Sequence, residues 1–284
     1  MTKQEISSFW YTPKGYKSIG LMELLSIKSF IDSGYKFILY TYNINDEIFK
    51  KLDELFDDFE LKDANEIVSF RNYFKDDRGA GVAAFSDYFR FNLLYLKGGV
   101  WVDLDMICLN YIDLNEEYIF TQEVDEDNTK SRITTSFLKF PQYSDFGKNL
   151  IQEAEKIINK RKQIPWGIIG PWFLADHVKK YGLENFAWDY KRTCQISWCN
   201  AKNFLDNNTS IDTNQPFLHL FSEMWRLNNM EKNTFHQMGV YGQLLKKHEI
   251  EKLYMQLHNQ PASISNKFTN LIQILSKKFK KKPT

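Results

Sequence analysis

Residues 86–105 read SDYFRFNLLYLKGGVWVDLD, and this stretch decides the fold. Its first half places bulky apolar residues at helical spacing, and Gly98-Gly99 ends that pattern. The apolar run Val100-Trp101-Val102 is then a short strand that leads directly into Asp103-Leu104-Asp105. Parallel sheets bind ligands where their strands end, so we expect a ligand site at the two aspartates.

The preceding residues show the same alternation of strand and helix. A β-prone run at 7–11 precedes a helical pattern at 21–31, a buried strand at 36–42 and an acidic amphipathic helix at 46–59. This order predicts an α/β fold with a parallel sheet and helical crossovers.

The rest of the chain adds helices to this α/β unit. A strand at 118–121 is followed by helical patterns at 146–162 and 172–181, and residues 183–260 are mixed. We expect one domain over residues 1–260 and a separate amphipathic, lysine-rich tail over 261–284.

The composition of the chain excludes several classes of protein. A net charge of +1 over 284 residues gives no overall field that would attract nucleic acid. Cys108, Cys194 and Cys199 are too few and too irregular for a disulfide framework, so we expect free thiols in a reducing compartment. No apolar stretch is long enough to span a membrane, and residues 1–5 do not resemble a signal peptide. A cytoplasmic location follows as the expectation.

Asp103 and Asp105 are a candidate cation site. Side chains two residues apart on a strand point the same way, and two adjacent carboxylates repel unless a cation lies between them. Oxygen ligands of this kind suit Mn²⁺ or Mg²⁺. An Asp-x-Asp pair also occurs by chance in many exposed turns, but here apolar residues flank it on both sides.

Ser86-Asp87-x-x-Arg90, Leu94, Gly98-Gly99, Trp101 and Asp103-x-Asp105 together resemble the sugar-binding region of family 32 glycosyltransferases. That family includes the clostridial glucosylating toxins, the yeast initiating α-1,6-mannosyltransferase and bacterial capsule and lipopolysaccharide enzymes. Vertebrate α-1,4-galactosyltransferases share the same core. The resemblance implies a GT-A fold, here with added helices and a C-terminal amphipathic helix.

The resemblance also implies roles for the polar residues of this region. Ser86, Asp87 and Arg90 would bind the donor sugar, although Asp87 and Arg90 could equally form an internal i,i+3 salt bridge. Asp103 would contact the sugar and the ribose and help to bind the metal, whereas Asp105 would be the main metal ligand.

Other candidate residues lie further along the chain. Trp10 would stack on the uracil base unless it is a core residue, and Tyr40 and Thr41 would contact the nucleoside. Gly170-Pro171 would line the acceptor side.

A late segment, His219-Leu-Phe-Ser-Glu-Met-Trp225, would complete the site. The resemblance implies His219 as the third metal ligand, with Glu223 as the alternative, and Ser222 or Trp225 over the diphosphate.

The function that follows from the resemblance is retaining transfer of a hexose from a UDP-sugar to a glycan or glycolipid acceptor. The hexose would be galactose, glucose or an N-acetylated form, and the setting bacterial surface polysaccharide synthesis. Two alternatives stay open. A sugar-phosphate nucleotidyltransferase would need a phosphate loop, for which Pro13-Lys14-Gly15 is a weak candidate. In an inactive carbohydrate-binding module the acidic pair would be structural.

The tail carries a separate expectation. An apolar face precedes a cluster of lysines, as in segments that bind the anionic inner face of a plasma membrane. The alternative is a solvated basic terminus. The apolar and basic residues concerned are Phe268, Leu271, Ile272, Ile274, Leu275, Lys277, Lys278, Lys280, Lys281 and Lys282.

Overall fold

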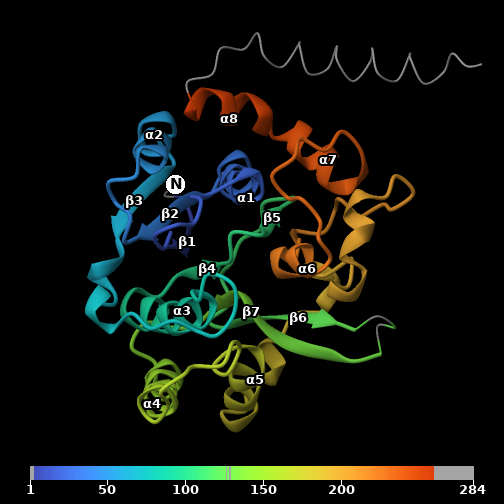
Figure 1. Cartoon of the computed structure of the whole chain (residues 1–284). Helices are drawn as coiled ribbons and strands as arrows, with labels where there is room; N and C mark the ends of the chain where they lie inside the picture. Colours follow the sequence, from blue (N-terminus) through green and yellow to red (C-terminus); the bar gives the residue numbers. More distant parts are fainter. Residues whose placement is uncertain (1–2, 126, 128, 259–284) are drawn as a thin grey trace, which may run out of the picture.

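The computed structural model describes residues 3–125, 127 and 129–258. A six-stranded sheet in the order β3-β2-β1-β4-β7-β6 forms its centre, and β5 and β8 make a second, smaller sheet (Figure 1). The strands are β1 (Glu5–Trp10), β2 (Lys36–Thr41), β3 (Phe59–Asp63), β4 (Val100–Val102), β5 (Met106–Cys108), β6 (Ile119–Val124), β7 (Ser131–Lys139) and β8 (Phe217–His219). The expected α/β class is confirmed.

The first four strands of the sheet run parallel, as the alternation of strands and helices predicts. Helices α1 (Leu21–Asp32) and α2 (Glu47–Leu55) connect β1 to β2 and β2 to β3, and α3 (Ala83–Lys97) precedes β4. Strand β4 returns to the free side of β1, where Val100 pairs with Ile6. The strand order therefore reverses between β1 and β4, and such a switch point opens a crevice at the carboxyl ends of the strands.

Both faces of the sheet are buried. Along β2, Phe37 and Leu39 belong to one apolar cluster, while Ile38 and Tyr40 belong to another on the opposite face. Helix α1 packs on the first face and α3 on the second, with the sheet between them (Figure 1). Continuous apolar strands are typical of parallel sheets covered on both sides, and this rigid core positions the strand ends.

Strands β7 and β6 extend the sheet in the antiparallel sense, which the sequence patterns do not predict. Strand β7 pairs with β4 and with β6. Its sequence, SRITTSFLK, is rich in hydroxyl residues and lacks the apolar run by which the other strands are recognised.

Two local expectations are wrong. The helix expected over 46–59 stops at Leu55, because Phe59 and Leu61 belong to the edge strand β3. Asp103-Leu104-Asp105 does not continue β4 but forms a turn, in which Met106 N donates to Asp103 O at 3.0 Å. The rule that places alternate strand residues on one side therefore does not apply to Asp103 and Asp105.

The remaining helices follow β7 in the chain. The helices expected at 146–162 and 172–181 are confirmed as α4 and α5, with ends shifted by one to three residues. In the described part of the chain the remaining helices are α4 (Asp145–Asn159), α5 (Pro171–Lys180), α6 (Ser222–Leu227), α7 (Gly239–Lys247) and α8 (Ile250–Leu257), with 3₁₀ turns at Glu184–Phe186, Tyr190–Arg192 and Trp198–Leu205. Two further 3₁₀ turns, Ala64–Glu66 and Phe70–Asn72, lie between β3 and α3.

Cys108, Cys194 and Cys199 are free thiols, as expected. Within the described ranges, no helix combines the length and the apolar character that crossing a bilayer requires. The amphipathic tail expected over 261–284 lies outside the described residues.

Gly98 ends α3 in a backbone conformation that residues with a side chain rarely adopt, with φ 67° and ψ −150°. We expect Gly98→Ala to lower the free energy of unfolding by about 1–3 kcal/mol, because a Cβ strains this conformation. Urea denaturation measures the change. The neighbouring exposed Lys97 provides the control, since Lys97→Ala should change stability by less than about 0.5 kcal/mol. Equal midpoints for the two variants would contradict the prediction.

Candidate active site

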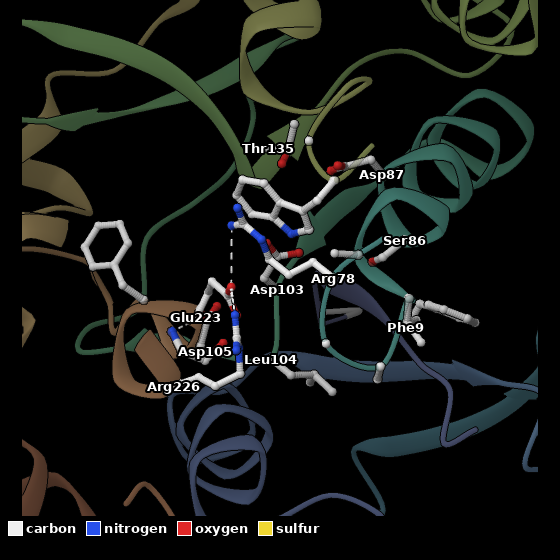
Figure 2. A pocket seen from close by; sticks show the side chains of 18 of the residues that line it. Phe9, Arg78, Ser86, Asp87, Asp103, Leu104, Asp105, Thr135, Glu223 and Arg226 are labelled. Atoms are coloured by element: carbon white, nitrogen blue, oxygen red, sulfur yellow. Dashed lines mark hydrogen bonds and ion pairs between the residues drawn. The ribbon is translucent and has the colours of Figure 1, made fainter. Parts of the chain in front are cut away.

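A cavity of about 530 Å³ opens at the carboxyl ends of β1 and β4. Trp10 lines it from the end of β1, and Asp103 and Asp105 line it from the turn after β4. Ser86 and Asp87 face it from α3, and Figure 2 shows these two residues with the aspartates around the open space. The switch point of the sheet and the acidic turn therefore coincide.

Arg90 joins two of the carboxylates. Its guanidinium lies 3.3 Å from Asp87 Oδ1 and 3.0 Å from Asp103 Oδ1, and it also donates to Thr135 O at 2.6 Å. The ring of Trp101 lies 4.8 Å from the guanidinium carbon. The i,i+3 salt bridge considered as an alternative is thus present, and both of its members nevertheless line the cavity.

Asp105 is held by residues from the late segment of the chain. Its Oδ2 accepts a hydrogen bond from Ser222 N at 2.8 Å, and its Oδ1 lies 3.3 Å from His219 Nε2. The pairing of β5 with β8 sets this geometry, because Met106 is the register partner of His219. Two of the three residues expected to bind a metal are therefore in contact.

The environments of the three carboxyl groups differ. Burial raises the pKa of Asp87 to about 6, although Arg90 opposes the change. Burial also raises the pKa of Asp103 against the attraction of Arg90. For Asp105 burial acts in the same direction, but His219 and the hydrogen bonds from Ser222 outweigh it and hold the pKa of this carboxyl below its usual range. Asp105 in turn outweighs the effect of burial on His219 and raises the pKa of that imidazole. Asp105 is thus the group most firmly held as an anion.

The donor atoms present fit a hard divalent cation. His219 Nδ1 is buried without a hydrogen-bond partner, and buried Asp105 Oδ1 makes no hydrogen bond beyond its 3.3 Å contact with His219 Nε2. A buried polar atom without a partner is costly. Among the described residues, however, no three or more His, Cys, Asp or Glu side chains converge closely enough to enclose a metal ion. An arrangement with one or two protein carboxylates is usual for Mg²⁺ when substrate phosphates complete the coordination.

Three of the expected contact residues lie outside the cavity. Tyr40 and Thr41 are 2% and 0% exposed on β2 and do not line it. Trp225 is 0% exposed, and its Nε1 donates to Leu220 O at 2.9 Å within the core. The expectation that Trp225 covers the diphosphate is therefore wrong, whereas Ser222 does line the cavity. Pro171, at the start of α5, also reaches it.

Several residues that line the cavity carry no sequence signal. Arg78 lies 3.6 Å from Glu223 across the mouth of the cavity, as the dashed line in Figure 2 shows, and Glu223 also pairs with Arg226 at 2.6 Å. Glu223 is consequently engaged by two arginines. Two further ion pairs line the cavity. Glu23 pairs with Lys232, 209 residues further along the chain, and Glu123 on β6 pairs with Arg132 on the neighbouring strand β7.

The model of one protein family matches this region of the chain. Its description is glycosyltransferase sugar-binding region containing DXD motif, and it matches residues 25–146, which include α3, β4 and both aspartates. Residues 25–146, less than half of the chain, are therefore similar to the sugar-binding region of DXD glycosyltransferases. This match supports a transferase, and the α/β fold with a parallel-rich central sheet is consistent with that of GT-A enzymes.

Solved structures show only distant similarity. The PaToxG glycosyltransferase is 11% identical over 63% of this chain and 69% of its own, with a TM-score of 0.46. The glycosyltransferase GlyE of Streptococcus pneumoniae is 12% identical over 86% of this chain and 63% of its own, with a TM-score of 0.43. The UDP-bound glycosyltransferase domain of the YGT toxin is 9% identical over 81% of this chain and 68% of its own, with a TM-score of 0.36. No curated protein matches the chain.

The raised pKa of Asp87 predicts a pH-dependent stability. The folded protein protonates Asp87 near pH 6 and the unfolded chain near its ordinary value of 3.8, so stability falls as the pH rises between these values. Asp87→Asn removes this titration. Relative to the wild type, it should gain about 1–3 kcal/mol between pH 4 and pH 7. Thermal unfolding in buffers across this range measures the gain.

Asp212 offers a control with the opposite sign. Hydrogen bonds from Asn214 lower its pKa, so its contribution to stability is present at neutral pH and is lost on acidification. Asp212→Asn should therefore lose stability relative to the wild type as the pH rises. Parallel pH profiles for wild type and Asp87→Asn would show that burial does not perturb Asp87.

Proposed function

We propose that this chain is a retaining hexosyltransferase that moves a hexose from a UDP-sugar to a glycan or glycolipid acceptor. One observation carries the proposal. The acidic turn after β4 lies in the same cavity as the Asp87–Arg90 pair and Trp10, which are the groups needed for a metal, a sugar and a nucleobase. The match of residues 25–146 to a glycosyltransferase sugar-binding region supports it.

The donor would lie along the carboxyl ends of β1 and β4. Trp10, at the end of β1, offers an aromatic face for the uracil. Asp87 and Arg90 lie deeper, on α3, where their charged groups can form strong hydrogen bonds with sugar hydroxyls. Asp103, which is already bonded to Arg90, would contact both the sugar and the ribose.

The cation would be Mn²⁺ or Mg²⁺. Asp105 is the ligand with the strongest support, because its buried Oδ1 makes no hydrogen bond beyond the 3.3 Å contact with His219, and Asp103 would assist it. His219 is better placed than Glu223 as a third ligand, since it touches Asp105 while Glu223 is paired with arginines. When bound, the ion would neutralise charge on the departing diphosphate.

The residues of this chain would act mainly by positioning and electrostatics. The bond between the anomeric carbon and the diphosphate oxygen breaks, and its electron pair stays with the diphosphate. The acceptor oxygen bonds to the anomeric carbon on the same face, and its proton passes to the leaving diphosphate. Arg90 and Asp87 would hold the sugar during this exchange.

The proposal includes a biological setting. The motif of residues 86–105 resembles family 32 enzymes, which include enzymes of bacterial capsule and lipopolysaccharide synthesis. We propose such a role at the inner face of the plasma membrane. The lysine-rich segment 261–284 would provide the membrane contact, and its charge supports that part of the proposal.

Release of UDP from UDP-glucose, UDP-galactose and their N-acetylated forms tests the proposal. Release should require Mn²⁺ or Mg²⁺, and Asp105→Asn should lower it by about 10²-fold or more, because the variant loses the main metal ligand. Asp113→Asn, which alters an exposed aspartate outside the cavity, is the control and should retain full release.

The alternative functions predict different products. A nucleotidyltransferase would form a UDP-sugar and pyrophosphate from UTP and a sugar phosphate, and a carbohydrate-binding module would bind sugars without releasing UDP. Metal-independent release, or full release by Asp105→Asn, would contradict the proposed role of the acidic turn.

A further inference from the structure

One end of the cavity holds an ion pair framed by tryptophans. Arg132 on β7 is the register partner of Glu123 on β6, and their side chains form a salt bridge. The guanidinium carbon of Arg132 lies 5.7 Å from the ring of Trp198 and 5.6 Å from that of Trp172. Glu123, Arg132 and Trp198 line the cavity, and Trp172 flanks it in the first turn of α5, beside Pro171. The donor placement described above uses none of these four side chains.

Strand β7 connects this group to the donor end of the cavity. Ser136 O accepts a hydrogen bond from Asp103 N at 2.8 Å, and Thr135 O accepts from Arg90 at 2.6 Å. Arg132 lies four residues before Ser136, which is about 13 Å along a strand. Thr134 lines the cavity between the two ends. A molecule beside Arg132 would therefore lie next to a sugar that is held by Arg90.

Hydrogen bonds to strand β6 hold the residues of this group in place. Ser197 Oγ donates to Val124 O at 2.8 Å, and Thr193 Oγ1 donates to Gln122 O at 3.4 Å. These bonds fasten the segment that carries Trp198 to strand β6 on both sides of Glu123. The side chain of Glu123 is only 7% exposed, so its carboxylate is held in place before any ligand arrives.

The negative charge of Glu123 and the positive charge of Arg132 cancel within the group. Glu123 balances Arg132, so the pair offers a hydrogen-bond acceptor and several donors without excess charge. A phosphate or uronate would need a surplus positive charge here, whereas a neutral sugar needs alternating donors and acceptors beside an aromatic face. Trp172 supplies such a face, since 65% of its surface is exposed.

We infer that Glu123, Arg132, Trp172 and Trp198 form the acceptor subsite, and that it binds a neutral hexopyranose unit of a glycan. The inference rests on the proposed transferase function and adds the class of acceptor to it. The sugar ring lies against the tryptophans, a ring hydroxyl donates to Glu123, and Arg132 donates to a second hydroxyl. Thr134 lies on the path toward the donor sugar.

Acceptor kinetics test the subsite. The full chain is assayed with Mn²⁺ and the UDP-sugar that it hydrolyses fastest, using methyl glucoside, methyl galactoside and methyl N-acetylglucosaminide as acceptor probes. At least one of these should accelerate UDP release and become glycosylated. Trp172→Ala should raise the KM for that probe about tenfold and lower transfer relative to donor hydrolysis, because a stacking face is lost. Trp198→Ala should act in the same direction.

Tyr143→Ala is the matched control. Tyr143 is 63% exposed, close to the exposure of Trp172, and it does not line the cavity. This variant should keep the acceptor KM and the hydrolysis rate of the wild type. If Trp172→Ala and Trp198→Ala match it, or if none of the three glycosides is glycosylated, the inference is overturned.

Glu123→Gln tests the charge argument. The variant leaves the guanidinium of Arg132 without a counter-charge, so the preference for methyl glucuronoside over methyl glucoside should rise about tenfold. A wild-type protein that already prefers the glucuronoside would overturn the assignment to neutral sugars. The same would follow if Glu123→Gln left the preference unchanged.

Two readouts separate the failure of this inference from the failure of the proposed function. Donor hydrolysis without any acceptor reports on the donor site alone, and its absence in the wild type would contradict the transferase proposal. Saturation-transfer NMR with the three methyl glycosides and no donor reports on the subsite alone. Contact signals that are weakened in Trp172→Ala and kept in Tyr143→Ala would support the subsite, and equal signals in the two variants would overturn it.

Discussion

The mutual repulsion of three carboxylates around one cavity is the constraint on which this structure depends. Asp87, Asp103 and Asp105 cannot all ionise away from water without nearby positive charge. Arg90 lies between the first two, and His219 touches the third. Arg90 lies on α3 and His219 on β8, so each positive group belongs to a different element. Electrostatic attraction as well as apolar contacts therefore fixes the packing of α3 and of the β5–β8 sheet against the central sheet.

Two sheets bring these charged residues together. The reversal of strand order between β1 and β4 opens the crevice, and the short β5–β8 pairing brings residues more than a hundred positions away to its rim. Phe221 follows β8 in a left-handed conformation, with φ 55°, and turns the chain so that Ser222 N faces Asp105. Strained backbone of this kind is common where a site must be held in one geometry.

The parts of the site that are contiguous in the sequence could be predicted from it. Asp87, Arg90 and the acidic turn lie within twenty residues, and helical spacing and a glycine stop define their relative placement. Tyr40 and Trp225 show where such reasoning fails, because an aromatic residue near a strand end or a motif can belong to the core. The Glu123–Arg132 pair could not be predicted, since it exists only through the register of two strands, one of which lacks an apolar pattern.

Strand β7 has a consequence for how enzymes of this kind diverge. Its later residues hold Arg90 and Asp103 through main-chain carbonyls, which are present whatever the side chain, while Arg132 near its beginning acts through its own side chain. Mutations near the start of the strand can therefore accumulate without altering the backbone contacts of Asp103 and Arg90. Under the acceptor assignment proposed above, gene duplication followed by drift at these few positions would yield paralogues that share one activated sugar and attach it to different polymers.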